Sequence, residues 1–314
     1  MKVLITDGLE SEAISSLRKA HEVDVQELDP KGLLAAIPRY HALIVRSRTI
    51  VSKAVLTQAA NLKVVGRAGV GVDNIDVGEA TARKIAVVNA PTASTISVAE
   101  LAIGQMISLL RHLPEADRSV KEGKWEKKKL EGRELFGKTL GLVGSGRIGA
   151  EVAKRAQAFG MRVIAHDPYL SRPTAEALGI RLVERDAVFR EADVVSIHAA
   201  LTPETRGMVG ATEFALMKRG TILVNCARGE IVQEAALADA LRSERLAGAA
   251  VDVFETEPPV GSPLLSAPNT AFTPHLGAST REAQARAGSI IAEQVLKVLD
   301  GRRPEFLVNS DVYG

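Results

Sequence analysis

The sequence predicts an α/β fold with two doubly wound parallel sheets. Short runs rich in β-branched residues alternate along the whole chain with longer helical patterns, which is typical of βαβ units. The 314 residues suffice for two domains of ordinary size. A content of 46% hydrophobic and 25% charged residues excludes a disordered or fibrous chain.

The first part of the chain predicts one α/β unit. Its helical patterns include Ser11–Ala20 and Lys53–Ala60. Its strands are expected at Lys2–Ile5, Glu22–Val25, Ala42–Val45, Lys63–Gly66 and Ala86–Asn89.

An apolar helix follows this unit. Ser97 and Glu100 have the spacing of a capping box, and Pro114 is expected to stop the helix at Leu113. The helix is apolar on most sides, which predicts burial between domains. It is too short and too often interrupted by polar residues to span a membrane.

A second alternating series predicts a sheet of six strands. Its first helix is expected at Ala150–Phe159, and a long final helix at Thr280–Leu299 is expected to return to the first domain. We therefore expect one domain from residues 1–95 and 281–314, a second from residues 96–280, and a ligand cleft between them. The second series of strands is expected at Thr139–Val143, Arg162–Ala165, Val194–Ile197, Thr221–Asn225, Ala249–Val253 and Thr270–Thr273.

Charge and cysteine content narrow the function classes. The 40 Lys and Arg against 38 Asp and Glu leave a net charge of +2 with no long basic run, so we expect no nucleic-acid partner. The only cysteine, Cys226, excludes an internal disulfide and a multi-cysteine metal site, so a cytoplasmic protein without a metal is expected. The first residues enter a strand pattern directly, and no signal peptide is expected.

The segment Gly141–Gly149 carries a G-x-G-x-x-G turn between a predicted strand and a predicted helix. Gly144 permits the tight turn, Gly146 lets a pyrophosphate approach the backbone, and Gly149 lets the helix pack closely on the strand. The N–H groups at the start of the helix can bind an anion. This context predicts a dinucleotide site.

An acidic residue indicates which dinucleotide binds. The strand after the glycine turn leads into Asp167, whose carboxylate can accept hydrogen bonds from the adenosine ribose hydroxyls. A carboxylate there would repel a 2′-phosphate, so NAD is favoured over NADP. The alternative is a structural turn with an incidental surface carboxylate.

Three further candidates follow later strands, at the sheet edge where ligands bind in such folds: Arg228, Glu257 and His275. Oxidation of a hydroxy acid needs a base for the hydroxyl proton, a cation for the carboxylate and an acid that orients the base. Histidine, arginine and glutamate supply these roles. Taken singly, each also has an ordinary explanation: the histidine as a turn residue, the arginine as a member of an ion pair, and the glutamate as a solvated carboxylate.

Several stretches spread over nearly the whole chain match one family. They are Val45–Ser47, Val65–Asp76, Ala99–Leu101, Gly137–Gly141, the glycine turn, Asn225–Gly229, Asp252–Phe254 and Pro274–Thr280. On these stretches the sequence resembles the D-2-hydroxyacid dehydrogenases, and within them the phosphoglycerate dehydrogenases. The resemblance implies a Rossmann-type cofactor domain inserted in a flavodoxin-like substrate domain.

The resemblance also implies roles for single residues. Arg228, Glu257 and His275 match the catalytic arginine, glutamate and histidine of the family, and Asp252 matches a residue that approaches the nicotinamide carboxamide. The positions that match NAD contacts are Val70, Gly144, Gly146, Arg147, Ile148, Gly149, Asp167, Ala199, Cys226, Ala227, Arg228, Asp252, His275, Gly277 and Ala278.

Substrate contacts are implied in the same way. Gly69 and Val70 belong to a loop that matches the segment whose N–H groups hold the substrate carboxylate. Arg46 matches an arginine that lies near the substrate phosphate in the family, and Arg48 and Arg67 lie close to it in the sequence pattern. The expected substrate positions are Arg46, Arg67, Gly69, Val70 and Lys127.

The family implies a homodimer, with contacts expected from the helix Ser97–Leu113 and from Trp125, for which a buried core role is the alternative. Lys127 matches a basic residue that some relatives present to the neighbouring subunit; the alternative is that Lys127–Lys129 only solvate a loop. No room for a C-terminal regulatory domain is expected after Asn309.

The resulting expectation is NAD-dependent oxidation of 3-phospho-D-glycerate to 3-phosphohydroxypyruvate, the entry step of L-serine biosynthesis. Two other functions stay open. A glyoxylate or hydroxypyruvate reductase, or another D-2-hydroxyacid dehydrogenase, would share every catalytic residue. An NAD-sensing protein of the corepressor type would share the cofactor site.

Overall fold

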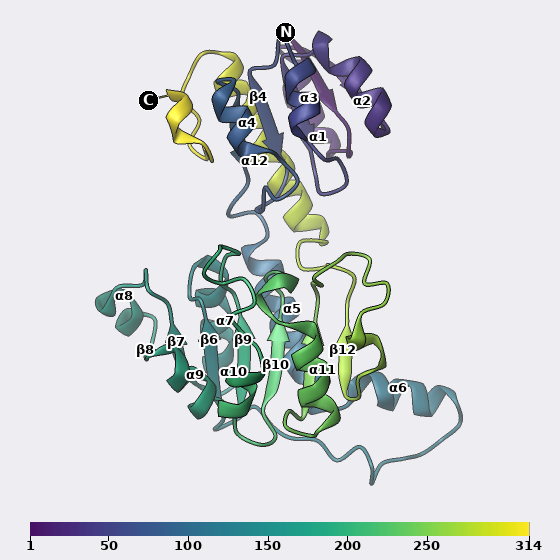
Figure 1. Cartoon of the computed structure of the whole chain (residues 1–314), viewed down its shortest axis with the longest axis vertical. Helices are drawn as coiled ribbons and strands as arrows, with labels where there is room; N and C mark the ends of the chain where they lie inside the picture. The colour runs from purple at the N-terminus through teal and green to yellow at the C-terminus, as the bar shows by residue number, and fades with distance from the viewer. Residues whose placement is uncertain (314) are drawn as a thin grey trace. The chain divides into compact units, whose positions relative to one another are not determined.

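The structure, a computed structural model, describes residues 1–313, which form two compact units (Figure 1). Unit 1 comprises Met1–Ser94 and the chain from Ala278 onward, and unit 2 comprises Thr95–Gly277. The boundaries between the two units therefore lie after residues 94 and 277. The sequence suggested boundaries after residues 95 and 280.

Unit 1 contains a parallel five-stranded sheet in the order β2-β1-β3-β4-β5, which is the flavodoxin-like order. Its strands are β1 (Lys2–Ile5), β2 (Glu22–Val25), β3 (Ala42–Val45), β4 (Val64–Arg67) and β5 (Ala86–Asn89). Its helices are α1 (Ser11–Arg18), α2 (Pro30–Ala36), α3 (Lys53–Gln58), α4 (Val77–Ala82) and α12 (Arg281–Leu299).

Helices cover both faces of this sheet. On one face, α1 and α12 bury residues such as Leu17 and Val295, and on the other, α2, α3 and α4 bury residues such as Leu33 and Leu56. Figure 1 shows α12, near the end of the chain, beside β4. Gly66 permits this approach, because a Cβ there would lie 2.9 Å from Cγ2 of Val295. The last helix therefore packs on the first sheet.

Unit 2 contains a parallel seven-stranded sheet in the order β12-β11-β10-β9-β6-β7-β8. This is the dinucleotide-binding order with one additional strand at the β12 edge. Its strands are β6 (Thr139–Val143), β7 (Arg162–His166), β8 (Ile180–Leu182), β9 (Val194–Ile197), β10 (Ile222–Asn225), β11 (Gly248–Val251) and β12 (Thr270–Phe272). Its helices are α5 (Thr95–Leu110), α6 (Leu113–Lys121), α7 (Arg147–Ala158), α8 (Arg172–Ala177), α9 (Arg185–Glu191), α10 (Ala211–Leu216) and α11 (Glu234–Arg242).

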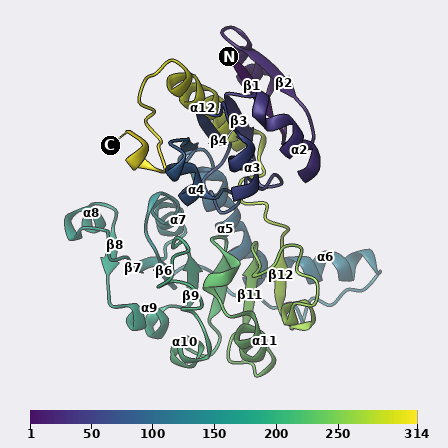
Figure 2. The same ribbon diagram turned by 45° about the horizontal axis from the view of Figure 1, so that its top comes forward.

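Two layers of helices enclose the second sheet. Figure 2 shows α5 and α7 on one face and α9, α10 and α11 on the other. Met106 of α5 and Val152 of α7 are fully buried on the first face, and Phe189 of α9 on the second. The predicted fold class, with two doubly wound parallel sheets and the second unit inserted in the first, is confirmed.

Two local predictions were wrong. The sequence suggested six strands in the second sheet, and the structure adds β8, whose three residues are too short for a recognisable alternation. The apolar helix was expected to end at Leu113, but it ends at Leu110. His112, two residues later, adopts a left-handed φ of 51°, and Pro114 lies in the first turn of α6. Proline is tolerated in a first turn, because the N–H that it lacks has no partner there.

No single helix in residues 1–313 is long and apolar enough to cross a membrane. Taken as a pair, α5 and α6 meet the criteria of length and composition, but they are bent by 62° at the break between them.

Candidate active site

Arg228 lies in the loop that follows β10, and hydrogen bonds from a side chain stabilise this loop. The side chain of Asn225 spans this loop: its Oδ1 accepts the N–H of Ala227 at 3.1 Å, and its Nδ2 donates to the carbonyl of Arg228 at 3.0 Å. Gly229 lies so close to the next loop that a Cβ there would be 1.9 Å from the carbonyl carbon of Phe254. The loops that follow β10 and β11 are therefore in direct contact.

Glu257 and His275 form a hydrogen-bonded pair in unit 2. Nδ1 of His275 lies 2.8 Å from Oε2 of Glu257, and Oε1 of Glu257 accepts the N–H of Phe254 at 3.2 Å. The two side chains are 40% and 45% exposed, so a small molecule can reach them.

The protonation of this pair follows from the charge of Glu257. Burial raises the pKa of its carboxyl, but the hydrogen bonds from His275 and Phe254 and the nearby Arg228 outweigh burial and hold this pKa below its usual range. An ionised carboxylate only accepts hydrogen bonds, so Nδ1 of His275 carries a proton and Nε2 is left for a ligand. The pair is arranged as a base and its orienting acid.

His275 lies in a strained turn that Asp252 supports. Its φ of 53° is in the left-handed region, which residues with a Cβ rarely adopt. Asp252 is 1% exposed; its Oδ1 accepts the N–H of Leu276 at 2.7 Å, and its Oδ2 accepts the N–H of Gly277 at 2.9 Å. The predicted site residues thus lie in loops that follow the carboxyl ends of β10, β11 and β12 in the second sheet. They are Arg228, Asp252, Glu257 and His275.

The glycine turn has the geometry that a dinucleotide site requires. Gly144 has a φ of 88°, and a Cβ there would lie 2.7 Å from the backbone nitrogen of Ala199. A Cβ on Gly149 would lie 2.6 Å from the carbonyl oxygen of Gly144, so the glycine lets α7 pack on the turn. A Cβ on Gly146 would meet no atom within 4 Å, which leaves space for a pyrophosphate.

Asp167 faces this turn. Its Oδ2 accepts the N–H of Ser145 at 2.7 Å and its Oδ1 accepts the N–H of Tyr169 at 2.9 Å, which leaves a second lone pair on each oxygen for ribose hydroxyls. The Oγ of Ser145 is buried and has no hydrogen-bond partner within residues 1–313. Gly146, at the N-cap of α7, offers no side chain to the first turn. These residues fit an adenine dinucleotide, with Arg147 and Ile148 in the first turn of the helix.

Cys226 lies beside this edge and is buried. Burial, and then the charge of Asp252, raise the pKa of its thiol. The thiolate is therefore suppressed, and Cys226 contributes packing and backbone rather than nucleophilic chemistry.

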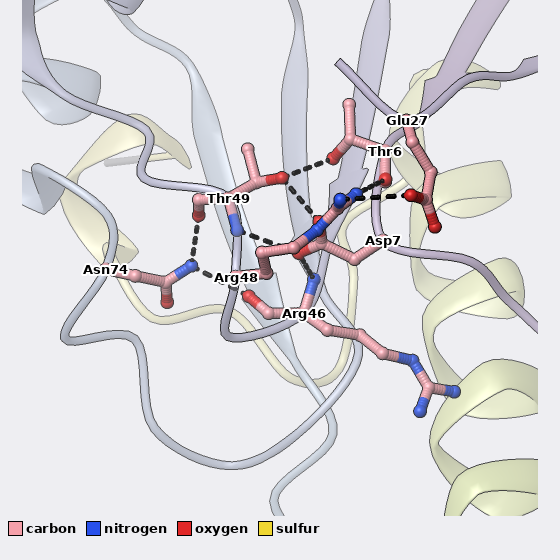
Figure 3. Close-up of polar contacts among 7 residues, drawn as sticks. All are labelled: Thr6, Asp7, Glu27, Arg46, Arg48, Thr49 and Asn74. Atoms are coloured by element: carbon pink, nitrogen blue, oxygen red, sulfur yellow. Dashed lines mark hydrogen bonds and ion pairs between the residues drawn. The ribbon is translucent and has the colours of Figure 1, made fainter. Parts of the chain in front are cut away.

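In unit 1, Asp7 organises the loop that carries two of the candidate arginines (Figure 3). Its Oδ2 accepts the N–H groups of Arg46 at 2.7 Å and Thr49 at 3.0 Å, and its Oδ1 lies 3.2 Å from Nε of Arg48. Burial raises the pKa of Asp7, but the hydrogen bonds from Thr49, Arg46 and Arg48 outweigh burial and lower this pKa. Asp7 was missed in the sequence, although it lies only two residues after the end of β1.

The guanidinium groups of this loop already have protein partners. Nη2 of Arg46 lies 2.8 Å from Oε1 and 3.0 Å from Oε2 of Glu10, and Arg48 donates to the carbonyl of Thr6 at 2.6 Å and to Glu27 at 3.2 Å. Nε of Arg46 is buried and has no hydrogen-bond partner in the described chain. In Figure 3 the guanidinium of Arg46 extends away from Asp7.

The loop after β4 holds the other substrate candidates of unit 1. A Cβ on Gly69 would lie 1.4 Å from Nη1 of Arg67, so glycine is needed for Arg67 to fold over the loop. The N–H of Gly69 donates to the carbonyl of Arg67 at 2.7 Å, which takes this N–H out of the expected carboxylate nest. Nδ2 of Asn89 donates to the carbonyl of Val70 at 2.6 Å.

Lys127 lies in an exposed loop after α6, next to an ion pair between Glu126 and Lys129 at 2.7 Å. Trp125, in the same loop, is 84% exposed, so the alternative of a buried core role for this residue is wrong. No group of three or more His, Cys, Asp or Glu side chains within residues 1–313 could hold a metal ion.

Residues 103–277 match the family described as "D-isomer specific 2-hydroxyacid dehydrogenase, NAD binding domain". This match covers more than half of the chain and includes the glycine turn, Asp167 and the pair of Glu257 and His275. The chain belongs to the D-isomer specific 2-hydroxyacid dehydrogenase family and carries its NAD-binding domain.

One curated relative and two solved structures illustrate the resemblance in sequence and fold. The chain is 50% identical over 98% of its length to the D-3-phosphoglycerate dehydrogenase of Methanocaldococcus jannaschii, but it spans only 59% of the length of that relative. A crystal structure from Thermus thermophilus is 38% identical with a TM-score of 0.90, covering 98% of this chain and 100% of the other. A glyoxylate reductase from Paecilomyes thermophila is 30% identical, also with a TM-score of 0.90, and the match covers 98% of both chains.

Proposed function

We propose that the protein is an NAD-dependent D-3-phosphoglycerate dehydrogenase, which oxidises 3-phospho-D-glycerate to 3-phosphohydroxypyruvate. The observation that carries the proposal is the pair of His275 and Glu257, joined at 2.8 Å beside the loop of Arg228. The relatives that share up to 50% of its residues and carry this name support the choice of substrate. This reaction is the entry step of L-serine biosynthesis.

The protein's own residues divide the work of the reaction. Nε2 of His275 takes the proton from the hydroxyl at carbon 2, and Glu257 holds the ring through Nδ1 and stabilises its protonated form. Arg228 holds the substrate carboxylate and polarises the forming carbonyl. Bound NAD supplies the acceptor for the hydride that leaves carbon 2.

The cofactor is held by the turn of Gly144, Gly146 and Gly149 and by the carboxylate of Asp167. The N–H groups at the start of α7 receive the pyrophosphate, and the remaining lone pairs of Asp167 receive the ribose hydroxyls. Among the other sequence candidates, Ala199 borders the glycine turn, Gly277 is bonded to Asp252, and Ala278 follows it as the first residue of the returning segment of unit 1.

For the substrate phosphate we infer a role for Arg46, on the strength of its match to the family. Val70, Arg67 and Lys127 keep their sequence-based assignments near the substrate.

The test is NADH oxidation by the purified protein with equal concentrations of 3-phosphohydroxypyruvate, hydroxypyruvate and glyoxylate. We expect a preference for the phosphorylated acid of about a hundredfold in kcat/KM, or about 3 kcal/mol at the transition state. Equal or faster turnover of the unphosphorylated acids would overturn the choice of substrate. Tight NADH binding without turnover of any acid would overturn the enzymatic proposal itself.

A glyoxylate or hydroxypyruvate reductase is the second candidate, and one observation favours it. Arg46 is paired with Glu10, so an internal carboxylate already balances the charge that would select a phosphate. The structural match to a glyoxylate reductase agrees with this interpretation. The three-substrate comparison separates the two candidates.

We further infer a cytoplasmic homodimer. Exposed apolar side chains occur in α6 and in the loop after it: Val120 is 57%, Trp125 84% and Phe136 75% exposed. Such residues are typical anchors of protein interfaces. Light scattering of the wild type and of a Trp125→Glu variant tests this inference. We expect the wild type to be a dimer and the variant to shift toward the monomer. A monomeric wild type would overturn the inference.

A further inference from the structure

A chain of hydrogen bonds connects helix α5 with the carboxylate beneath His275. Gln105 is 5% exposed in an apolar stretch of α5, and its Nε2 lies 3.0 Å from Oγ1 of Thr273. Oγ1 of Thr273 lies 2.6 Å from Oδ1 of Asp252. An amide N–H only donates and a carboxylate only accepts, so the threonine hydroxyl receives the bond from Gln105 and gives its single proton to Asp252.

This chain of bonds ends on the group that shapes the turn of His275. Oδ1 of Asp252 also accepts the N–H of Leu276 at 2.7 Å, and Oδ2 accepts the N–H of Gly277 at 2.9 Å. The backbone carbonyl of Asp252 accepts the N–H of His275 at 2.8 Å. All of these residues belong to unit 2. The turn is therefore fixed on both sides of the histidine.

The turn needs such support because it is strained. His275 has a φ of 53°, and a residue with a Cβ keeps a left-handed conformation only where its surroundings over-determine it. Two bonds on Oδ1, from Thr273 and Leu276, fix the rotation of the Asp252 carboxylate. Without the hydroxyl of Thr273, Oδ1 loses one of its two bonds, so the carboxylate is less firmly held and the N–H bonds that define the turn weaken.

The count of acceptor positions leaves room for a ligand. A carboxylate offers about four lone-pair positions, and three on Asp252 are used within the protein. The remaining position is on Oδ2, where a further donor can bind. Thr273 thus stabilises the protein side of the carboxylate and leaves its ligand side available.

We propose that Gln105 and Thr273 are positioning residues, which act through Asp252 to hold the left-handed turn that presents His275. The proposal rests on the proposed role of His275 as the base. Burying a glutamine amide in an apolar helix costs free energy unless its hydrogen bonds are made, and the hydroxyl of Thr273 provides one of them. Neither residue touches the reacting atoms in this scheme.

The test uses two variants and matched controls. Thr273→Val removes the hydroxyl at nearly constant shape, and Gln105→Met removes the amide at nearly constant length. Thr273→Ser keeps the hydroxyl and serves as the rescue. The controls make the same chemical changes away from the site: Thr221→Val, where the hydroxyl of a buried threonine bonds to a carbonyl in unit 2, and Gln294→Met, a glutamine 1% exposed in unit 1.

Two readouts are compared. The first is hydrogen exchange by mass spectrometry over residues 273–280 of the full chain without ligands, which reports on the N–H groups of Leu276 and Gly277. The second is kcat and KM for the 2-oxo acid that the wild type turns over. For Thr273→Val and Gln105→Met we expect exchange at least about tenfold faster and kcat lower by on the order of tenfold to a hundredfold, with little change in KM. Thr273→Ser and both controls should match the wild type in exchange and in kcat.

The outcomes separate this proposal from the proposed function. Faster exchange with an unchanged kcat, or unchanged exchange in both variants, would overturn the positioning role. An equal loss of kcat in Thr221→Val would overturn it too, because the effect would then follow from general destabilisation. A wild type without turnover would overturn the proposed function, and the exchange measurement would still decide whether Gln105 and Thr273 hold the turn.

Discussion

Arg46 is paired with Glu10 inside unit 1: Nη2 of the arginine lies 2.8 Å and 3.0 Å from the two carboxylate oxygens. Glu10 packs against Gly288 of α12, where a Cβ would lie 2.6 Å from Oε2. The arginine that we propose for the substrate phosphate is therefore held by an internal anion. Glu10 and a substrate phosphate would compete for one guanidinium.

This competition predicts the effect of Glu10→Gln. The neutral amide releases the charge of Arg46, so the KM for 3-phosphohydroxypyruvate should fall about threefold to tenfold, corresponding to about 1 kcal/mol of binding free energy. The KM for hydroxypyruvate, which has no phosphate, should stay unchanged and is the internal control. Steady-state kinetics with both acids checks this, and a higher KM for the phosphorylated acid would show that Glu10 orients Arg46 instead.

Asp7→Asn should lower the stability of the fold at neutral pH. The carboxylate accepts hydrogen bonds from Thr49, Arg46 and Arg48, and loss of such charge-assisted bonds costs about 2 kcal/mol of unfolding free energy. The pKa of Asp7 is lower in the folded state than its ordinary 3.8. Its contribution is therefore complete above about pH 4 and is lost as the pH falls through the folded-state pKa.

Urea titrations of the wild type and of Asp7→Asn at several pH values measure this difference. The two curves should lie apart at about pH 7 and approach one another below about pH 4. A difference that stays constant down to the lowest pH would contradict the assignment to the ionised carboxylate.

Glu257→Gln should lower kcat by about a hundredfold or more, since the amide no longer stabilises the protonated ring of His275. Binding of NADH, followed by fluorescence, should be nearly unchanged, because Glu257 has no assigned cofactor contact. Glu176→Gln, on the exposed side of α8, is the matched control and should retain full activity. If Glu257→Gln keeps its kcat, His275 does not depend on this carboxylate.

The thiol of Cys226 should resist alkylation in the folded protein. Burial and the charge of Asp252 raise its pKa, and only the thiolate reacts. At about pH 8 we expect iodoacetamide to modify the native protein at least about a hundredfold more slowly than the protein in guanidinium chloride. Mass spectrometry over time gives both rates, and rapid modification of the native protein would contradict the burial of this residue.

Most strands were predictable because their buried β-branched runs are bounded by polar turns, and β1, β3, β5, β6 and β9 have the bounds that the sequence indicated. The bounds of β2 also agree, although its alternating residues are partly or fully exposed. The short edge strand β8 could not be predicted, because Ile180–Leu182 has too few residues to show the alternation of apolar and polar residues that indicates a strand. The contact between Glu257 and His275 was accessible from the sequence, because both follow neighbouring parallel strands whose carboxyl ends meet at one edge.

Other partners could not be predicted, because no local pattern joins residues so far apart in the chain. Glu10 meets Arg46, and Gln105 meets Thr273, only through the packing of complete elements. A signal existed for Gln105 and for Asp7, however. Gln105 interrupts an apolar helix, which indicates a polar partner, and Asp7 follows a strand at the same edge as other functional residues.

The position of α12 on the first sheet has a consequence for synthesis of the chain. Unit 1 lacks the helix that covers Ile44 and Gly66 until Leu299 has left the ribosome, whereas every strand and helix of unit 2 is complete at Phe272. The continuous unit is therefore expected to fold first, while one face of the five-stranded sheet is covered by α1 alone and stays partly exposed. During that interval the nascent chain needs protection from aggregation, and this requirement comes from the order of its segments rather than from its final stability.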